Sequence, residues 1–99
     1  MINKTIKTIC EQINSNELRF FGFVLIVNNE ENSLTLKKGF KYLTIKYIEG
    51  KDLYNIRQFE TIKFRLIEIN KLDGVYCDQL SDIIEDYFKF CYLHKVQFG

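Results

Sequence analysis

Residues 41–59 alternate between apolar and polar side chains on both sides of Gly50-Lys51, and this feature constrains the fold more than any other in the chain. Such alternation is typical of strands that bury one face, and a glycine that opens a two-residue loop is typical of a type II′ hairpin turn. Antiparallel strands joined by that loop place Tyr47 opposite Tyr54. We therefore predict a β-hairpin whose core face carries Leu43, Ile45, Tyr47, Tyr54 and Ile56.

The opposite face of this hairpin mixes aromatic, hydroxyl, amide and cationic side chains, namely Tyr42, Thr44, Lys46, Asn55, Arg57 and Phe59. Aromatic residues and arginine are enriched at the buried centre of protein interfaces. Rings that alternate with cations also suit the stacking of single-stranded bases. We predict that a partner binds to Tyr42, Lys46, Arg57 and Phe59; the alternative is a solvated face whose cations only discourage aggregation.

Amphipathic helices are expected at both ends of the chain. Isoleucine recurs with helical spacing at Ile2, Ile6, Ile9 and Ile13, and Asn14 suits the left-handed end of such a helix. A second helix is predicted over 75–93, with Asp73 as its N-cap. Its predicted buried stripe consists of Cys77, Leu80, Ile84, Tyr87 and Cys91.

Three further strands are expected. The unbroken apolar run at 20–27 predicts a strand that is buried on both faces and therefore central in the sheet. The alternating segments 33–37 and 61–69 predict half-exposed strands, and 70–74 predicts a turn before the last helix. The whole is an α+β fold in one domain, 1–99: an N-terminal helix, a four- to five-stranded antiparallel sheet and a C-terminal helix.

The net charge of +1 conceals an uneven distribution of charged residues. Residues 1–67 contain 11 basic and 7 acidic residues, whereas residues 68–99 contain 3 and 6. A chain so near neutrality is neither a histone-like binder nor an acidic mimic of DNA. The last helix carries an acidic group that is a competing candidate surface for a basic partner: Asp78, Asp82, Glu85 and Asp86.

The sequence predicts neither an enzyme nor a metal site. His94 stands at the end of the last predicted helix and Cys77 falls on its buried stripe, so neither has a predictable base or orienting group beside it. The three cysteines lack the spacing of a zinc site, and no phosphate-binding glycine motif is present, so we expect no cofactor. Without a signal peptide or an apolar run of bilayer length, the chain is expected in the cytoplasm.

Two short motifs resemble a group of small uncharacterised proteins encoded by phages and prophages. The first is Asp52-Leu53-Tyr54-Asn55, where the group has Asp-x-Tyr-Asp. The second is Gly-Val-Tyr-Cys-Asp-Gln-Leu at 74–80, with Glu85 beyond it. The resemblance covers about half of the chain, which departs from the group at Asn55 and at 90–93, where the usual Thr-Gly-Leu is missing.

No activity follows from the resemblance, which implies a small accessory protein that acts inside the host cell. Such proteins often work by covering a surface of a host protein. We therefore expect a non-enzymatic phage or prophage protein that binds and inhibits or modulates a host protein, for example in host defence, as anti-CRISPR proteins do. A small single-stranded nucleic-acid-binding protein is the alternative. An uncovered face or strand edge would also allow a homodimer.

Overall fold

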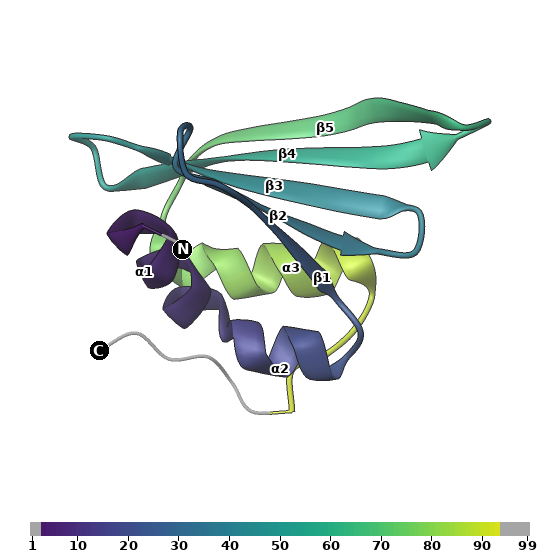
Figure 1. Cartoon of the computed structure of the whole chain (residues 1–99), viewed down its shortest axis with the longest axis horizontal. Coiled ribbons are helices and arrows are strands. Elements are labelled where there is room, and N and C mark those ends of the chain that lie inside the picture. The colour runs from purple at the N-terminus through teal and green to yellow at the C-terminus, as the bar shows by residue number, and fades with distance from the viewer. Residues whose placement is uncertain (1–2, 94–99) are drawn as a thin grey trace.

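The computed structural model describes residues 3–93, which form two layers (Figure 1). The elements are, in chain order, α1 (Lys4–Ile13), α2 (Ser15–Phe20), β1 (Val24–Asn28), β2 (Ser33–Lys38), β3 (Lys41–Ile48), β4 (Leu53–Ile62), β5 (Arg65–Val75), the 3-10 helix η1 (Cys77–Gln79) and α3 (Leu80–Phe88). The strands form one antiparallel sheet in the order β1-β2-β3-β4-β5, and the helices lie on one of its faces. The predicted α+β fold is therefore confirmed.

The β3–β4 hairpin has the predicted register, with Tyr47 opposite Tyr54. All five residues of the predicted core face are buried or half-buried. The predicted two-residue turn is wrong, because residues 49–52 all lie outside the strands, and Gly50 and Asp52 both have positive φ, 82° and 53°. The longer loop is centred on the same point of the sequence as the predicted one, which is why the register is unchanged.

The N-terminal isoleucine stripe is the core face of α1, as predicted: Ile6, Ile9 and Ile13 are 0% exposed. Asn3 caps the helix, since its side-chain oxygen accepts a hydrogen bond from the Ile6 N–H at 2.8 Å. Asn14 ends the helix in the left-handed conformation, with φ 53°. Ile2 lies outside the described residues.

The apolar run 20–27 does not form a central strand. It divides into the end of α2 at Phe20, a bend, the buried Phe23 and the edge strand β1. Val24 and Ile26 are 52% and 46% exposed on the sheet face that no helix covers. An unbroken apolar run indicates a strand buried on both faces only where other elements cover both faces of the sheet. Here the helices cover one face and the other is open.

The segment 61–69 is not one strand but the end of a second hairpin. Ile62 is the last residue of β4, and the turn residues Lys63 and Phe64 have φ of 51° and 67°. Residues 70–74, predicted as a turn, instead continue β5, whose pairing with β4 is interrupted by two irregularities in register. The turn lacks glycine and asparagine, so its sequence does not differ from that of a strand.

The C-terminal helix is shorter than predicted, since α3 covers only Leu80–Phe88. Asp73 belongs to β5 and is not the cap; the Gln79 side chain accepts a hydrogen bond from the Tyr76 N–H at 2.9 Å as the chain enters η1. The predicted stripe is confirmed at its centre, where Leu80, Ile84 and Tyr87 are buried. Cys77 is half-buried before α3 and Cys91 is exposed after it.

Candidate functional site

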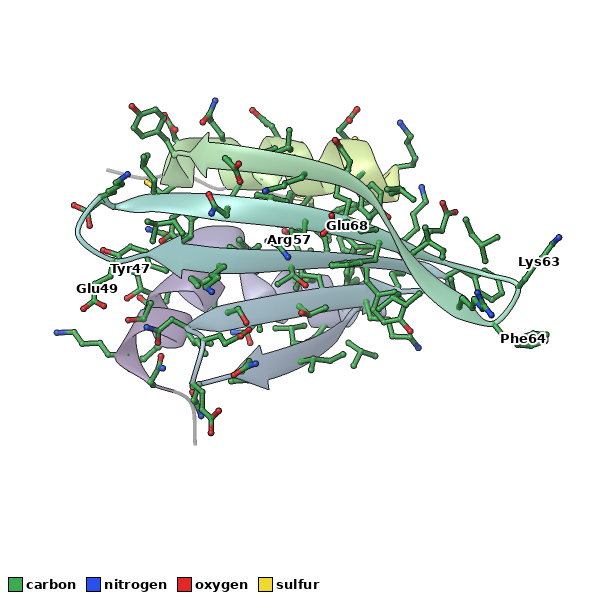
Figure 2. The ribbon with its side chains drawn as sticks, turned by 90° about the horizontal axis from the view of Figure 1, so that it is seen from above. Tyr47, Glu49, Arg57, Lys63, Phe64 and Glu68 are labelled. Carbon is green, nitrogen blue, oxygen red and sulfur yellow. The ribbon has the colours of Figure 1, made fainter. Side chains whose placement is uncertain are left out.

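The sheet has one face that the helices leave uncovered, and we call it the open face (Figure 2). The predicted hairpin residues Tyr42, Lys46, Arg57 and Phe59 all lie on it, because the register of β3 and β4 is the predicted one. Tyr42 lies opposite Phe59 and Lys46 opposite Asn55. Lys46 and Arg57 are exposed, whereas the two aromatic side chains are half-buried between their neighbours.

The cross-strand pairing orders the open face into rows that cross all five strands. One row contains Ile26, Thr35, Thr44, Arg57 and Lys71, and the next contains Val24, Lys37, Tyr42, Phe59 and Glu68. Each row therefore begins with an exposed aliphatic residue on β1 and ends with a charged residue on β5. Only the middle of this surface was predicted from the sequence, because the register of β1 and β5 depends on pairing between strands that the local pattern does not specify.

The electrostatics of the open face are dominated by cations. Arg57 has an acidic neighbour, Glu68, at 3.7 Å, with side chains 54% and 42% exposed; in Figure 2 the two lie side by side. An ion pair this exposed contributes at most about 1 kcal/mol to stability. The Lys37 ammonium lies 5.9 Å from the centre of the Tyr42 ring. Charge and aromatic surface are therefore available together to a binding partner.

A shallow hollow of about 440 Å³ runs over β1 to β4 on the open face. Its floor includes the hydroxyl pair Thr35–Thr44, whose oxygens lie 2.8 Å apart, and Lys46 and Arg57 stand along it. This size falls within the range of ligand pockets, but the hollow is open and has polar walls. Such a shape suits a side chain or loop of a partner better than an enclosed small molecule.

The acidic residues lie apart from the open face, in η1 and α3. Glu85 is half-buried, and its carboxylate accepts a hydrogen bond from the Tyr92 N–H at 2.8 Å, which ties the chain after α3 back to the helix. Asp86 lies 3.9 Å from the Lys89 ammonium. Asp78 and Asp82 are exposed. Glu85 is thus engaged within the fold, and the predicted group of four is not one free acidic surface.

The end of the β4–β5 hairpin, residues 62–69, which we call the arm, was not predicted from the sequence. Figure 1 shows this hairpin extending past the helices, and Figure 2 shows Lys63 and Phe64 at its tip. The arm exposes five large apolar side chains: Ile62 47%, Phe64 102%, Leu66 55%, Ile67 41% and Ile69 45%. The sequence feature that could have indicated the arm is the adjacent pair Leu66-Ile67, which places apolar side chains on both faces of one strand.

The two short motifs at 52–55 and 74–80 meet at the other end of the sheet. The Asn55 side chain accepts a hydrogen bond from the Gly74 N–H at 3.3 Å, and Asp52, Tyr54 and Cys77 line one hollow of about 410 Å³ beside α1. The Tyr47 hydroxyl donates to Asp52 at 2.7 Å, and this bond raises the pKa of Tyr47 above its usual value. These hydrogen bonds join β4 to the end of β5 and join β3 to the hairpin loop.

The Tyr54 hydroxyl closes the inner side of this hollow with a 2.6 Å hydrogen bond to the Gln12 side chain. Burial raises the pKa of Tyr54, and Cys77 adds to the shift. The side chains of Asp52, Tyr54 and Asn55 therefore already have hydrogen-bond partners within the fold. The motifs therefore have a structural explanation in the joining of hairpin and helix.

Comparison with protein-family models, curated proteins and solved structures finds no match for this chain. Within residues 3–93, no three histidine, cysteine or acidic side chains are grouped so as to hold a metal ion. Over the same residues, no helix has the length and apolar character needed to cross a membrane. His94 lies outside the described residues.

Proposed function

We propose that this chain is a non-enzymatic module that binds another protein through the open face and the adjoining arm. The observation that carries the proposal is the combination of exposed apolar and cationic side chains that no part of residues 3–93 covers. Ile26 and Val24 lie at one side of this surface, Tyr42 and Phe59 at its centre and the arm at its far end. Exposed apolar surface of this kind is rare in monomers unless it binds something.

The partner in this proposal is a host protein, and the effect of binding is inhibition or modulation. The resemblance to phage and prophage accessory proteins supports this setting, as does a site whose composition resembles an interface centre and not a catalytic cleft. The proposal places the chain in the host cytoplasm and requires no catalytic step and no cofactor. Host defence machinery is the class of target that this setting favours. Self-association is part of the same proposal, because the arm presents apolar surface to any copy of the chain.

A pull-down from host lysate tests this assignment. The variant Lys46→Glu with Arg57→Glu reverses the two exposed cations at the centre of the open face. The matched control, Lys7→Glu with Arg19→Glu, reverses one lysine and one arginine that are exposed on α1 and α2. Both variants carry the same net charge and should keep the melting temperature of the parent chain within a few degrees, since all four side chains are exposed.

We expect the control to retain a host protein after nuclease treatment and the open-face variant to lose it. If both variants retain the partner equally, the open face is not the site. If nuclease releases everything that the parent chain captures, the Tyr42, Phe59, Lys46 and Arg57 surface binds nucleic acid and the proposal is wrong. A third variant, Asp78→Lys with Asp86→Lys, tests the acidic helix; loss of the partner in this variant alone would move the site to α3.

A further inference from the structure

The outer edge of β5 is the longest uncovered backbone edge among the described residues. β5 has 11 residues, and the sheet order gives it a single neighbour, β4. Every residue from Arg65 to Lys71 is exposed. A strand edge with apolar side chains and unpaired backbone groups is a template for pairing with a further strand. The question is which strand this edge fits.

The side chains of β5 alternate in charge in a way that makes the edge complementary to itself. From its start the strand carries Arg65, Glu68, Lys71 and Asp73, so positive and negative charges follow one another along its length. Two antiparallel copies of such a strand bring opposite charges together in some registers and like charges in others. Like charges directly opposite each other on neighbouring strands are destabilising.

The pairing with β4 tells which face each residue of β5 occupies. Glu68 lies opposite Phe59 and Lys71 opposite Arg57, so both are on the open face. Ile67 lies opposite Glu60 and Leu72 opposite the buried Ile56, so both are on the helix side. Ile69 has no partner in β4, because Phe59 pairs with Glu68 and Gln58 pairs with Asn70.

This skipped residue permits a two-fold arrangement that is centred on the irregularity and in which like faces meet. We propose that two copies of the chain pair antiparallel through β5, about a two-fold axis that passes between Ile69 and Asn70 and stands normal to the sheet. Glu68 then lies opposite Lys71 of the second copy on the open face, and Ile67 lies opposite Leu72 of the second copy on the helix side. Each pair occurs twice by symmetry, and the result is a continuous ten-stranded sheet.

Two neighbouring registers, with the two-fold axis at Glu68 or at Ile69, are less favourable. An axis at Glu68 places this carboxylate opposite itself, and it places Leu66, on the open face, opposite Asn70, on the helix side. An axis at Ile69 places Ile67, on the helix side, opposite Lys71, on the open face, which a continuous sheet does not allow. Of these three registers, the one centred between Ile69 and Asn70 therefore has the best agreement of charge and face.

The proposed register also covers the side chains of the arm. It brings the arm tip, with the fully exposed Phe64, to the end of β5 in the second copy, where Tyr76 is 61% exposed. Aromatic pairs of this kind add to the affinity of an interface beyond their buried area. The exposed Leu66 and Ile69 lie along the shared edge. A second copy therefore accounts for the free edge, for the opposite charges of Glu68 and Lys71, and for the exposed apolar side chains of β5 and the arm tip.

Charge-swap variants followed by analytical ultracentrifugation test this inference, which deepens the self-association part of the proposed function. We expect the parent chain to be a dimer and Glu68→Lys and Lys71→Glu each to be monomeric, because each creates two pairs of like charges. The double variant Glu68→Lys with Lys71→Glu should be a dimer again. An equimolar mixture of the two single variants should form a heterodimer, since each supplies the charge that the other needs.

The control is Arg57→Gln, which removes the internal neighbour of Glu68 without changing the β5 edge; it should remain a dimer. A monomeric parent chain at the highest soluble concentration would overturn the inference. So would single variants that stay dimeric, or a mixture that does not associate. The host pull-down is scored separately: a monomeric parent that still captures a host protein overturns only the dimer, and a dimer that captures none overturns only the host-binding proposal.

Discussion

Two parts of the same sheet differ in what covers them, although their strands have similar residues. Under the helices, Leu34, Leu36, Leu43, Ile45 and Ile56 are all 0% exposed. In the arm, Ile62, Leu66, Ile67 and Ile69 are 41–55% exposed, because the hairpin extends past the helix layer (Figure 1). Alternation along the chain therefore identifies a strand and its two faces, but it does not indicate whether a second layer covers either face. The covered part stabilises the fold, and the arm remains available for association.

Truncation of an isoleucine in each part should show the largest difference. Ile45→Ala removes a fully buried side chain and should lower the free energy of unfolding by about 2–5 kcal/mol. Ile67→Ala, at a 41% exposed position in the arm, should lower it by less than about 0.5 kcal/mol in dilute, monomeric protein. Urea denaturation monitored by circular dichroism measures both values. Equal losses would mean that the arm packs as tightly as the core.

Alkaline pH should destabilise the covered part. Burial raises the pKa of Tyr54, Tyr87 and Tyr92, with a further contribution from Cys77 for Tyr54, from Glu60 for Tyr87 and from Glu85 for Tyr92. A raised phenol pKa means that the folded chain holds the proton more tightly than the unfolded chain does. The resulting stability is complete below a pH of about 10, the pKa of a free phenol, and is lost as the pH rises above it.

Urea titrations at pH 8, 9, 10 and 11 should therefore show an unfolding free energy that is constant at first and falls above about pH 10. The variant Tyr92→Phe should show a shallower fall than the parent chain. A free energy that falls equally in both would mean that Tyr92 does not contribute to this pH dependence.

Removal of one buried hydroxyl should cost less than the core truncation. The Tyr92 hydroxyl donates to the carbonyl of Ile13 at 2.8 Å, which ties the chain after α3 to the end of α1. Tyr92→Phe leaves this carbonyl without its partner and should lower the unfolding free energy at pH 7 by about 1–2 kcal/mol. Tyr47→Phe is the matched control: its exposed hydroxyl donates to Asp52, and water replaces that bond at little cost. A larger loss for Tyr47→Phe would contradict this account.

The smallest expected effect is a gain in stability at the arm tip. Phe64 is fully exposed and has a φ of 67°, a conformation that a side chain disfavours and glycine accepts. Phe64→Gly should raise the unfolding free energy of the dilute monomer by about 0.5–1 kcal/mol. Phe64→Ala, which keeps the Cβ atom, should not. The same Phe64→Gly variant should associate more weakly than the parent chain in ultracentrifugation; unchanged association would remove Phe64 from the interface.

Local rules were sufficient where the chain's own periodicity decides the structure. The isoleucine spacing predicted the buried face of α1, and Asn14 predicted its left-handed end. The alternation around Gly50 predicted the β3–β4 register, and with it that Tyr42, Lys46, Arg57 and Phe59 share one face. These features depend on neighbours within one or two turns of helix or one hairpin, and such neighbours can be read directly from the chain.

Errors arose where residues far apart in the chain decide the structure. Val24 and Ile26 resemble a central strand in sequence, but β1 is at the sheet edge and has no layer over its open side. Lys63 and Phe64 form a turn without a turn sequence, because eight residues of β4 pair with the strand that follows. Pairing over that length stabilises a strained turn that local preference alone would reject.

The period of side chains along the backbone was enough to predict the fold class, the core face of each amphipathic element and the aromatic and cationic composition of the open face. Packing between distant parts of the chain decided three other features: Glu85 is engaged by Tyr92, the motifs at 52–55 and 74–80 meet, and the arm is uncovered. Burial depends on which surfaces pack against each other in space. The pattern of residues along the chain shows which faces are apolar, but it does not show which of those faces come into contact.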